Sequence, residues 1–133
     1  MSKEPKQVVI DFCAAWDRRS VEDVLNYMAP DIAYQNVPSP TMHGKDAAAK
    51  FVTPLLKNTT KIEFRMLSIA ASGDKVLTER VDFLHFATGT VEIPLMGIFV
   101  VRDGKIAEWR DYSDLESVRS GFVQAKIDPR KLS

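Results

Sequence analysis

The spacing of the hydrophobic residues changes about halfway along the chain, and this change restricts the folds that the sequence can adopt. In residues 5–53 most apolar side chains recur three and four residues apart, which is typical of amphipathic helices. In residues 60–112 they recur at every second residue, which is typical of strands. Strands that follow one another directly pair as an antiparallel sheet, and helices segregated from such a sheet indicate an α+β fold.

The ends of the expected elements follow from capping residues and prolines. Helices are predicted at residues 5–17, between Ser20 and Pro30, at 45–53 and from residue 113 onward. Strands are predicted at residues 32–37, 60–71, 76–87, 91–101 and 106–112. Ser20 with Asp23, and Ser113 with Glu116, have the spacing of capping boxes. Pro54 is expected to stop or kink the third helix.

Turn residues separate the predicted strands. Asp103 and Gly104 form a strong hairpin signal, and Pro94 with Gly97 suggests a bulge in the preceding strand. The expected architecture is a strongly curved, mixed or antiparallel sheet with helices packed on its concave face, enclosing a deep pocket. Since the sequence contains no internal repeat or linker, residues 1–133 are expected to form one domain.

The charge balance argues against two classes of partner. Eighteen basic residues balance eighteen acidic ones without a basic stripe, so neither nucleic acid nor a membrane is expected as a partner. No apolar stretch reaches the length of a membrane span, and the first residues lack the apolar segment of a signal peptide. The single cysteine cannot form an internal disulfide. A cytoplasmic location is therefore expected.

Arg80 and Asp82 stand two residues apart in the strand predicted at residues 76–87. This spacing places both side chains on one face of the sheet. An ordinary ion pair is the simpler explanation for two such residues. Both faces of the strand are largely apolar, however, and a buried ion pair is costly to desolvate. Its presence in an interior strand therefore suggests a function.

Three further polar residues stand where they can join this pair. Asp111 ends the last predicted strand and approaches Arg80 and Asp82 if the last three strands are sequential neighbours. Tyr34 and Asn36 share one face of the early strand. Helix capping by Asp111 and strand-end hydrogen bonding by Tyr34 and Asn36 would each be unremarkable alone. Two carboxylates, a guanidinium, a phenol and an amide together favour a catalytic site.

The residues for several other chemistries are missing from the sequence. It has no histidine, cysteine and carboxylate cluster at metal-ligand spacing, no glycine-rich phosphate loop and no serine-nucleophile motif. Cys13 lies on the apolar face of a predicted helix, which is typical of a core residue. His43 lies in a loop, and His85 faces away from Arg80. Neither a metal nor a cofactor is expected.

Three separated segments resemble the limonene-1,2-epoxide hydrolase family. They are YQNVPSP at residues 34–40, ERVDFL at 79–84 and GKIAEWRDYSDL at 104–115. The resemblance implies a cone-shaped fold shared with nuclear transport factor 2-like proteins, ketosteroid isomerase and small polyketide cyclases, and it implies a homodimer. It also implies an enzyme that adds water to a small apolar epoxide, cyclic or terpene-like, to give a vicinal diol.

The same resemblance implies roles for the polar residues. Asp111 is the base, Tyr34 and Asn36 help it to hold the catalytic water, Asp82 is the acid, and Arg80 bridges the two carboxylates. With both aspartates ionised the trio carries a net charge of −1, and one proton makes it neutral, which a pocket of low dielectric favours. Water would attack in one step, without a covalent intermediate.

Four apolar residues are predicted to line the pocket, and these are Leu84, Leu95, Val118 and Trp16. A steroid isomerase or polyketide cyclase of the same fold is the alternative, but it gives the water-holding residues no task. A non-enzymatic binding module leaves the buried charges without a purpose. Leu77, Val81 and Phe83 face outward and make that face more apolar than a monomer normally exposes, so a homodimer through the sheet is expected.

Overall fold

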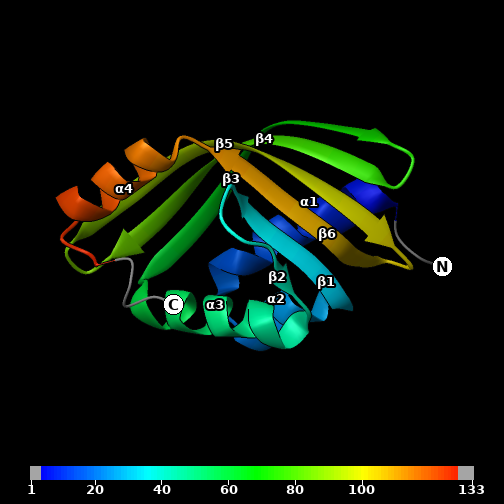
Figure 1. Cartoon of the computed structure of the whole chain (residues 1–133), viewed down its shortest axis with the longest axis horizontal. Helices are drawn as coiled ribbons and strands as arrows, with labels where there is room; N and C mark the ends of the chain where they lie inside the picture. Colours follow the sequence, from blue (N-terminus) through cyan, green and yellow to red (C-terminus); the bar gives the residue numbers. More distant parts are fainter. Residues whose placement is uncertain (1–3, 129–133) are drawn as a thin grey trace.

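Six strands of the computed structural model, which describes residues 4–128, form one strongly curved sheet (Figure 1). The strands are β1 (Met28–Val37), β2 (Met42–His43), β3 (Lys61–Ser72), β4 (Lys75–Phe86), β5 (Gly89–Arg102) and β6 (Lys105–Ser113). They lie in the order β2-β1-β6-β5-β4-β3. β1 runs parallel to β6, whereas the other neighbouring strands are antiparallel. The sheet is therefore mixed, and the predicted α+β class is confirmed.

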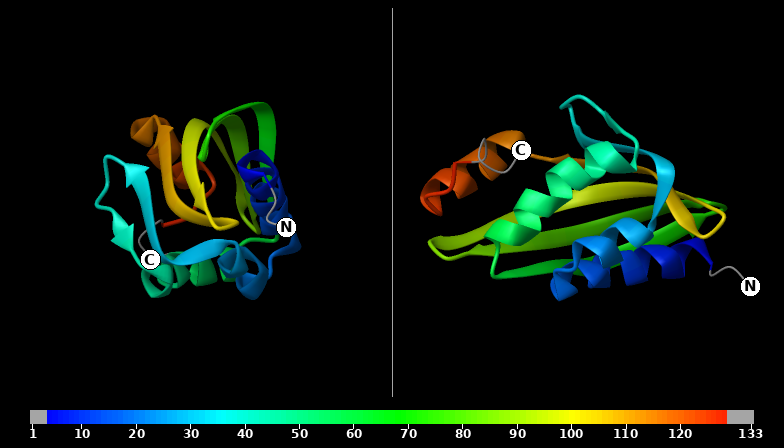
Figure 2. Two further views of the ribbon diagram at one scale, coloured as in Figure 1. Left: turned by 90° about the vertical axis from the view of Figure 1, so that its right-hand side faces the viewer. Right: turned by 90° about the horizontal axis from the view of Figure 1, so that it is seen from below.

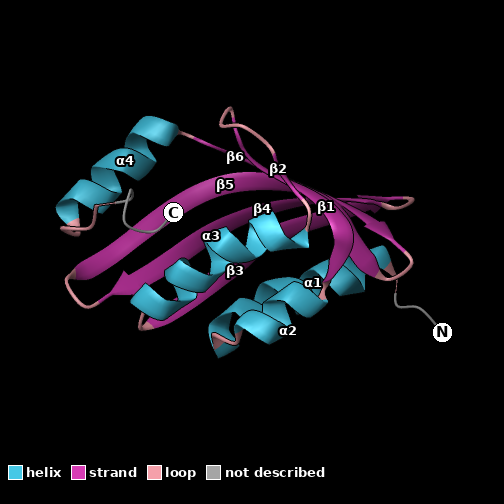
Figure 3. Ribbon diagram, turned by 60° about the horizontal axis from the view of Figure 1, so that its bottom comes forward, coloured by secondary structure: helices cyan, strands magenta, loops and turns pink. Residues whose placement is uncertain are grey.

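Helices cover the concave side of this sheet (Figures 2 and 3). The helices are α1 (Pro5–Ala15), the short 3-10 helix η1 (Trp16–Arg18), α2 (Val21–Asn26), α3 (Lys45–Asn58) and α4 (Leu115–Gln124). α1, α2 and α3 lie along the concave face, and α4 packs against β5 at one end. Within residues 4–128, no helix has both the length and the apolar character needed to cross a lipid bilayer.

An aromatic core joins α1 and η1 to the concave face. Phe12 and Trp16 are fully buried. The Phe12 ring meets Trp109 of β6 edge-on, with 5.1 Å between the ring centroids. Trp16 stacks on Phe64 of β3 at a centroid distance of 4.9 Å. Buried aromatic side chains contribute strongly to core stability, so these contacts fix the inner face of β6, on which Asp111 also lies.

Two local signals in the sequence are confirmed. Asp103 and Gly104 have positive φ angles of 53° and 75°, as a two-residue Asp-Gly hairpin requires. Ser20 Oγ accepts a hydrogen bond of 3.2 Å from the backbone N–H of Asp23, so Ser20 caps α2. Both motifs depend on residues that are close in sequence, which is why the sequence predicts them well.

The predicted end of the second helix at Pro30 is wrong. α2 ends at Asn26, and β1 begins at Met28, so Pro30 lies inside a strand. The pairing of β1 with β6 is irregular between Met28 and Ala33, and Pro30 falls within this interval. A proline is tolerated there because its nitrogen has no ladder hydrogen bond to donate.

The third helix does not end at residue 53, so the predicted stop at Pro54 is wrong. α3 continues through Pro54 to Asn58. Leu55 and Leu56 follow the proline and are buried in the core, and this burial favours continuation of the helix. The carbonyl of Pro54 accepts a hydrogen bond of 2.7 Å from the side-chain amide of Asn58. Tertiary packing therefore overrides the local proline signal.

The N-cap of α4 is Asp114 rather than the predicted Ser113. Asp114 Oδ1 accepts hydrogen bonds from the backbone N–H groups of Glu116 and Ser117, at 3.1 and 3.4 Å. Ser113 is instead the last residue of β6, where it pairs with Leu95 of β5. The sheet extends one residue further than predicted, and the start of the helix moves with it.

β5 has no register shift at Pro94 or Gly97, so the predicted bulge at these residues is wrong. β4 and β5 pair without interruption along the whole of β4. The irregularity of β5 lies between Val100 and Val101, where it pairs with β6. Gly97 therefore has a reason other than a bulge to be glycine.

Candidate active site

A cavity of about 330 Å³ lies between the concave face of the sheet and the helices α3 and α4. Most of the side chains that line it are apolar. α3 contributes Phe51 and Leu55, and α4 contributes Leu115, Val118 and Phe122. The structure also places the other three residues predicted to line the pocket on this cavity, and these are Leu84, Leu95 and Trp16. The cavity has the size of a small-ligand site.

Arg80, Asp82 and Asp111 form a buried trio at this cavity. Arg80 Nε donates to Asp82 Oδ1 at 3.1 Å, and Arg80 Nη2 donates to Asp82 Oδ2 at 2.9 Å. The same Nη2 donates to Asp111 Oδ2 at 3.1 Å. The three residues are only 1%, 5% and 6% exposed. Both carboxylates line the cavity, and Arg80 lies behind them as a shared partner.

The strand register explains how residues so far apart in sequence meet. Arg80 and Asp82 are two residues apart on β4 and share one face of the strand, as predicted, and this is the buried face. Thr78 of β4 lies opposite Gly97 of β5, and Gly97 lies opposite Asp111 of β6. The last three strands are therefore sequential neighbours in the sheet, and this arrangement brings Asp111 to Arg80 and Asp82.

Tyr34 and Asn36 reach the site from β1. In the parallel pairing of β1 with β6, Tyr34 lies opposite Trp109 and Asn36 lies opposite Asp111. The Tyr34 ring stacks on Trp109, with 4.1 Å between centroids and 15° between planes. Asn36 Nδ2 donates to the Tyr34 hydroxyl at 3.2 Å. Both residues line the cavity beside Asp111, so all five predicted polar residues converge on one place.

Trp109 is a site residue that the sequence analysis did not single out. Its Nε1–H donates to Asp111 Oδ1 at 2.7 Å. Asp111 therefore accepts one hydrogen bond on each oxygen, from Trp109 and from Arg80. The signal was present in the sequence, because Trp109 stands two residues before Asp111 on the same face of its strand.

Burial controls the protonation of the site. It raises the pKa of Asp82 from its usual 3.8 to about 6, although the Arg80 charge and hydrogen bonds act in the opposite direction. Burial also raises the pKa of Asp111 against the lowering effects of Arg80 and Trp109. The pKa of Tyr34 is raised, mainly by burial and then by the charge of Asp111, so the phenol keeps its proton. A trio with one shared proton is neutral, and this is the form that burial favours.

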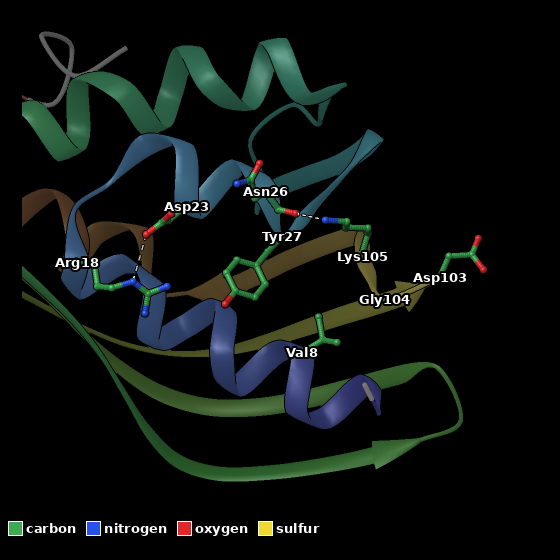
Figure 4. Close-up of a pocket in the computed structure, with 8 residues that line it drawn as sticks. All are labelled: Val8, Arg18, Asp23, Asn26, Tyr27, Asp103, Gly104 and Lys105. Carbon is green, nitrogen blue, oxygen red and sulfur yellow. Dashed lines mark hydrogen bonds and ion pairs between the residues drawn. The ribbon is translucent and has the colours of Figure 1, made fainter. Parts of the chain in front are cut away.

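A second hollow, of about 450 Å³, lies between α1, α2 and the turn that joins β5 to β6 (Figure 4). Arg18 and Asp23 on its rim pair at 3.3 Å, and their side chains are about half exposed, at 52% and 46%. Lys105 donates to the backbone carbonyl of Asn26. Exposed charges of this kind are well solvated and need no ligand. The buried trio therefore marks the smaller cavity as the candidate active site.

The chain is similar in sequence to known epoxide hydrolases. A family model described as "Limonene-1,2-epoxide hydrolase catalytic domain" matches residues 3–124. Epoxide hydrolase EphG of Mycobacterium tuberculosis (strain ATCC 25618 / H37Rv) is 28% identical over 116 residues, which cover 87% of this chain and 77% of that protein.

Solved structures of known proteins have the same fold. A structure of an M. tuberculosis LEH-like epoxide hydrolase superimposes with a TM-score of 0.82 and 28% identity, covering 94% of this chain and 93% of that chain. A protein with a ketosteroid isomerase-like fold from Catenulispora acidiphila DSM 44928 superimposes with a TM-score of 0.76, covering 98% of both chains. The identity to the second is 20%, so this match supports the fold alone.

Proposed function

Because the chain belongs to the limonene-1,2-epoxide hydrolase family, we propose that it adds water to a small apolar epoxide, cyclic or terpene-like, and releases a vicinal diol. The observation that carries this proposal is the pair of buried carboxylates, bridged by Arg80, on the wall of an apolar cavity. Opening an epoxide with water requires a base for the water and an acid for the leaving oxygen. Two carboxylates that share one proton supply both.

In the proposed reaction, Asp111 is the base and Asp82 is the acid. Tyr34, Asn36 and Asp111 hold a water molecule, and Asp111 takes a proton from it as the water oxygen attacks an epoxide carbon. The bond between this carbon and the epoxide oxygen breaks, and Asp82 gives its proton to that oxygen. Each proton transfer contributes roughly 10²–10⁴-fold to the rate. The water becomes one hydroxyl of the diol, and the epoxide oxygen becomes the other.

Arg80 keeps the trio neutral throughout this reaction. Before turnover, Asp82 is protonated and Asp111 is ionised, and after turnover the two states are exchanged. The sum of charges with Arg80 is zero in both cases, so the buried site never holds a net charge. Transfer of the proton from Asp111 back to Asp82 then resets the enzyme.

The cavity supports the proposed substrate class. Leu84, Leu95 and Val118 offer apolar walls to a hydrocarbon ring, and Trp16 offers an aromatic one. The reaction needs no metal or cofactor, because the two carboxylates supply the base and the acid. The described part of the chain contains no group of three or more histidine, cysteine, aspartate or glutamate side chains that is able to hold a metal ion.

Diol formation from a panel of cyclic, terpene and aryl epoxides tests the proposed function. Purified protein should convert at least one member of the panel, with the diol identified by mass spectrometry. Protein carrying Asp82→Asn, purified in the same way, controls for contaminating hydrolases. If no epoxide gives diol above the uncatalysed rate, or if Asp82→Asn gives as much as the unchanged protein, the proposal is wrong.

We further propose that the protein is a homodimer through the outer face of the sheet. This face, defined by Leu67 of β3, Leu77 of β4, Met96 of β5 and Tyr112 of β6, exposes large apolar side chains, each between 42% and 55% accessible. Large apolar side chains exposed on four adjacent strands favour a protein interface.

A further inference from the structure

Arg80 makes one hydrogen bond that the proposed acid–base chemistry does not use. Its Nη1 donates to Thr78 Oγ1 at 3.1 Å, and Thr78 Oγ1 donates to the backbone carbonyl of Gly97 at 3.1 Å. Thr78 is 1% exposed. A threonine hydroxyl has one hydrogen, and here the Gly97 carbonyl receives it. The lone pairs of Oγ1 therefore face Arg80, and Thr78 acts toward it as an acceptor.

Gly97 lies directly against Arg80, Asp111 and Thr78. A Cβ atom at this position would lie 2.5 Å from Asp111 Oδ1 and 2.6 Å from Arg80 Nη1, far inside normal contact distance. Gly97 is not among the glycines with a positive φ angle, so its backbone does not require glycine. Glycine is required here because the Arg80 guanidinium and the Asp111 carboxylate occupy the space that a side chain would need.

These contacts affect the site because Arg80 binds both carboxylates at once. One guanidinium must hold Asp82 through Nε and Nη2 and reach Asp111 through the same Nη2. A small rotation of the guanidinium would keep one carboxylate and lose the other. Thr78 holds the remaining corner, Nη1, and so fixes the orientation at which both carboxylates are bound.

We propose that Thr78 and Gly97 are positioning residues of the epoxide-opening site: Thr78 fixes the rotation of the Arg80 guanidinium, and Gly97 leaves the space in which Arg80 and Asp111 meet. This proposal rests on the proposed function for its effect on the rate. Its effect on the geometry of the two carboxylates is independent of any substrate.

Three threonine variants test the role of Thr78. Thr78→Val keeps the shape and removes the acceptor, Thr78→Ser keeps the acceptor, and Thr90→Val makes the same change at an exposed residue of β5. Thr78→Val should lower kcat by roughly 10- to 100-fold, as expected for a misplaced catalytic group, with a much smaller change in KM. Thr78→Ser should restore most of this loss, and Thr90→Val should leave kcat unchanged.

A ¹³C NMR titration of the aspartate carboxyl carbons gives a readout that needs no substrate. The titratable groups around Arg80 are Asp82, Asp111, Tyr34 and Cys13 of α1. Burial raises the pKa of Cys13 to about 12 and also raises that of Tyr34, so neither group titrates near the Asp82 pKa of about 6. A loosely held Arg80 stabilises the carboxylates less, so Thr78→Val should move both pKa values upward and Thr78→Ser should not.

Gly97→Ala tests the role of Gly97. The added methyl group should displace the ends of Arg80 and Asp111, which raises the pKa of both carboxyls and lowers kcat at least as much as Thr78→Val does. If Thr78→Val fails to fold, the ¹³C titration of Gly97→Ala still tests the proposal. Carboxyl pKa values unchanged in Gly97→Ala, or equal in Thr78→Val and Thr78→Ser, would overturn the proposal. Absence of diol from the unchanged protein would instead overturn the proposed function and leave the titration results valid.

Discussion

Arg80, Asp82 and Asp111 are buried together at a considerable cost in desolvation, which their mutual attraction repays only with good geometry. The geometry is good, since Arg80 binds Asp82 through two hydrogen bonds and Asp111 through one. Even so, the ionised trio retains a net charge of −1. Burial raises the pKa of both carboxyls against the lowering effect of Arg80, and it therefore favours a form of the trio that holds one proton.

Removal of either carboxylate should therefore nearly abolish activity. Asp82→Asn cannot donate the proton to the epoxide oxygen, and Asp111→Asn cannot accept one from water. We expect each to lower kcat/KM on the order of 10²–10⁴-fold, measured with the best epoxide of the panel. Asp31→Asn, at an exposed position of β1, is the matched control and should be silent. Unchanged turnover by Asp82→Asn would mean that the buried trio is purely structural.

The raised pKa of Asp82 also predicts how stability depends on pH. The pKa of Asp82 is about 6 in the folded protein, whereas the usual value of 3.8 applies to the unfolded chain. The folded state therefore binds the proton more tightly. The resulting stabilisation is complete below about pH 4 and is lost as the pH rises through about 6. By the linkage relation it amounts to at most about 3 kcal/mol, and Asp111 acts in the same direction.

Urea unfolding at several pH values, compared between the unchanged protein and Asp82→Asn, measures this contribution. The comparison removes the effects of carboxylates remote from Asp82, such as Asp114, whose pKa is lowered by hydrogen bonds from Ser117. The free energy of unfolding of the unchanged protein, relative to that of the variant, should fall between about pH 4 and pH 7. A difference that stays constant over this range would contradict a raised pKa for Asp82.

At the scale of elements, α4 links stability to the shape of the cavity. Leu115, Val118 and Phe122 of this helix line the cavity, and Asp114 caps its first turn. Asp114→Ala should cost about 1 kcal/mol of stability, the usual cost of a lost N-cap. Because the helix start would then fray over the cavity, KM should rise more than kcat falls.

Thermal unfolding and steady-state kinetics measure the two effects of Asp114→Ala. Glu116→Gln, which removes a charge from the exposed surface of the same helix without removing the cap, is the control. An unchanged KM in an Asp114→Ala protein of reduced stability would mean that α4 does not shape the substrate site.

Elements defined by neighbouring residues were predictable, and elements defined by packing were not. The four long strands follow from the period of two, and the Asp103–Gly104 turn follows from its own residues. The continuation of α3 through Pro54 depends on burial of Leu55 and Leu56 against other elements. No local pattern in the sequence carries that information.

The same distinction applies to the site. Period-two spacing places Arg80 and Asp82 on one face, and sequential pairing brings Asp111 beside them. The approach of Tyr34 and Asn36 depends on the parallel pairing of β1 with β6, which residue patterns alone do not reveal. The side chains that require a glycine at position 97 belong to neighbouring strands. The sequence around Gly97 does not show them, so a bulge was the expected reason for this glycine.

At the scale of the whole molecule, the outer face of the sheet should form the homodimer interface. Met96→Glu places a charge at the middle of this face, where Met96 is 55% exposed, and should convert a dimer into a monomer. Val123→Glu on α4, at a side chain that is 61% exposed, is the control and should remain dimeric. Light scattering at micromolar concentration reports the mass. A monomer mass for the unchanged protein would contradict the predicted interface.

The contacts of the two aspartates bear on which of two routes of epoxide hydrolysis the site can support. A carboxylate can attack the epoxide carbon and form an ester, which requires a separate base to hydrolyse that ester. Here Asp82 is bound to Arg80 through both oxygens, and Asp111 accepts hydrogen bonds from Trp109 and Arg80. His85 and His43 do not line the cavity, so neither is placed to serve as that base. We therefore expect direct attack by water.

A single turnover in ¹⁸O-labelled water, with enzyme in excess over epoxide, tests this central claim most directly. Mass spectrometry of the first-formed diol and of the protein locates the label. Direct attack by water places ¹⁸O in the diol and leaves Asp82 and Asp111 unlabelled. An unlabelled diol together with ¹⁸O in one of these aspartates would show that the aspartate is a nucleophile, and it would contradict the acid–base mechanism.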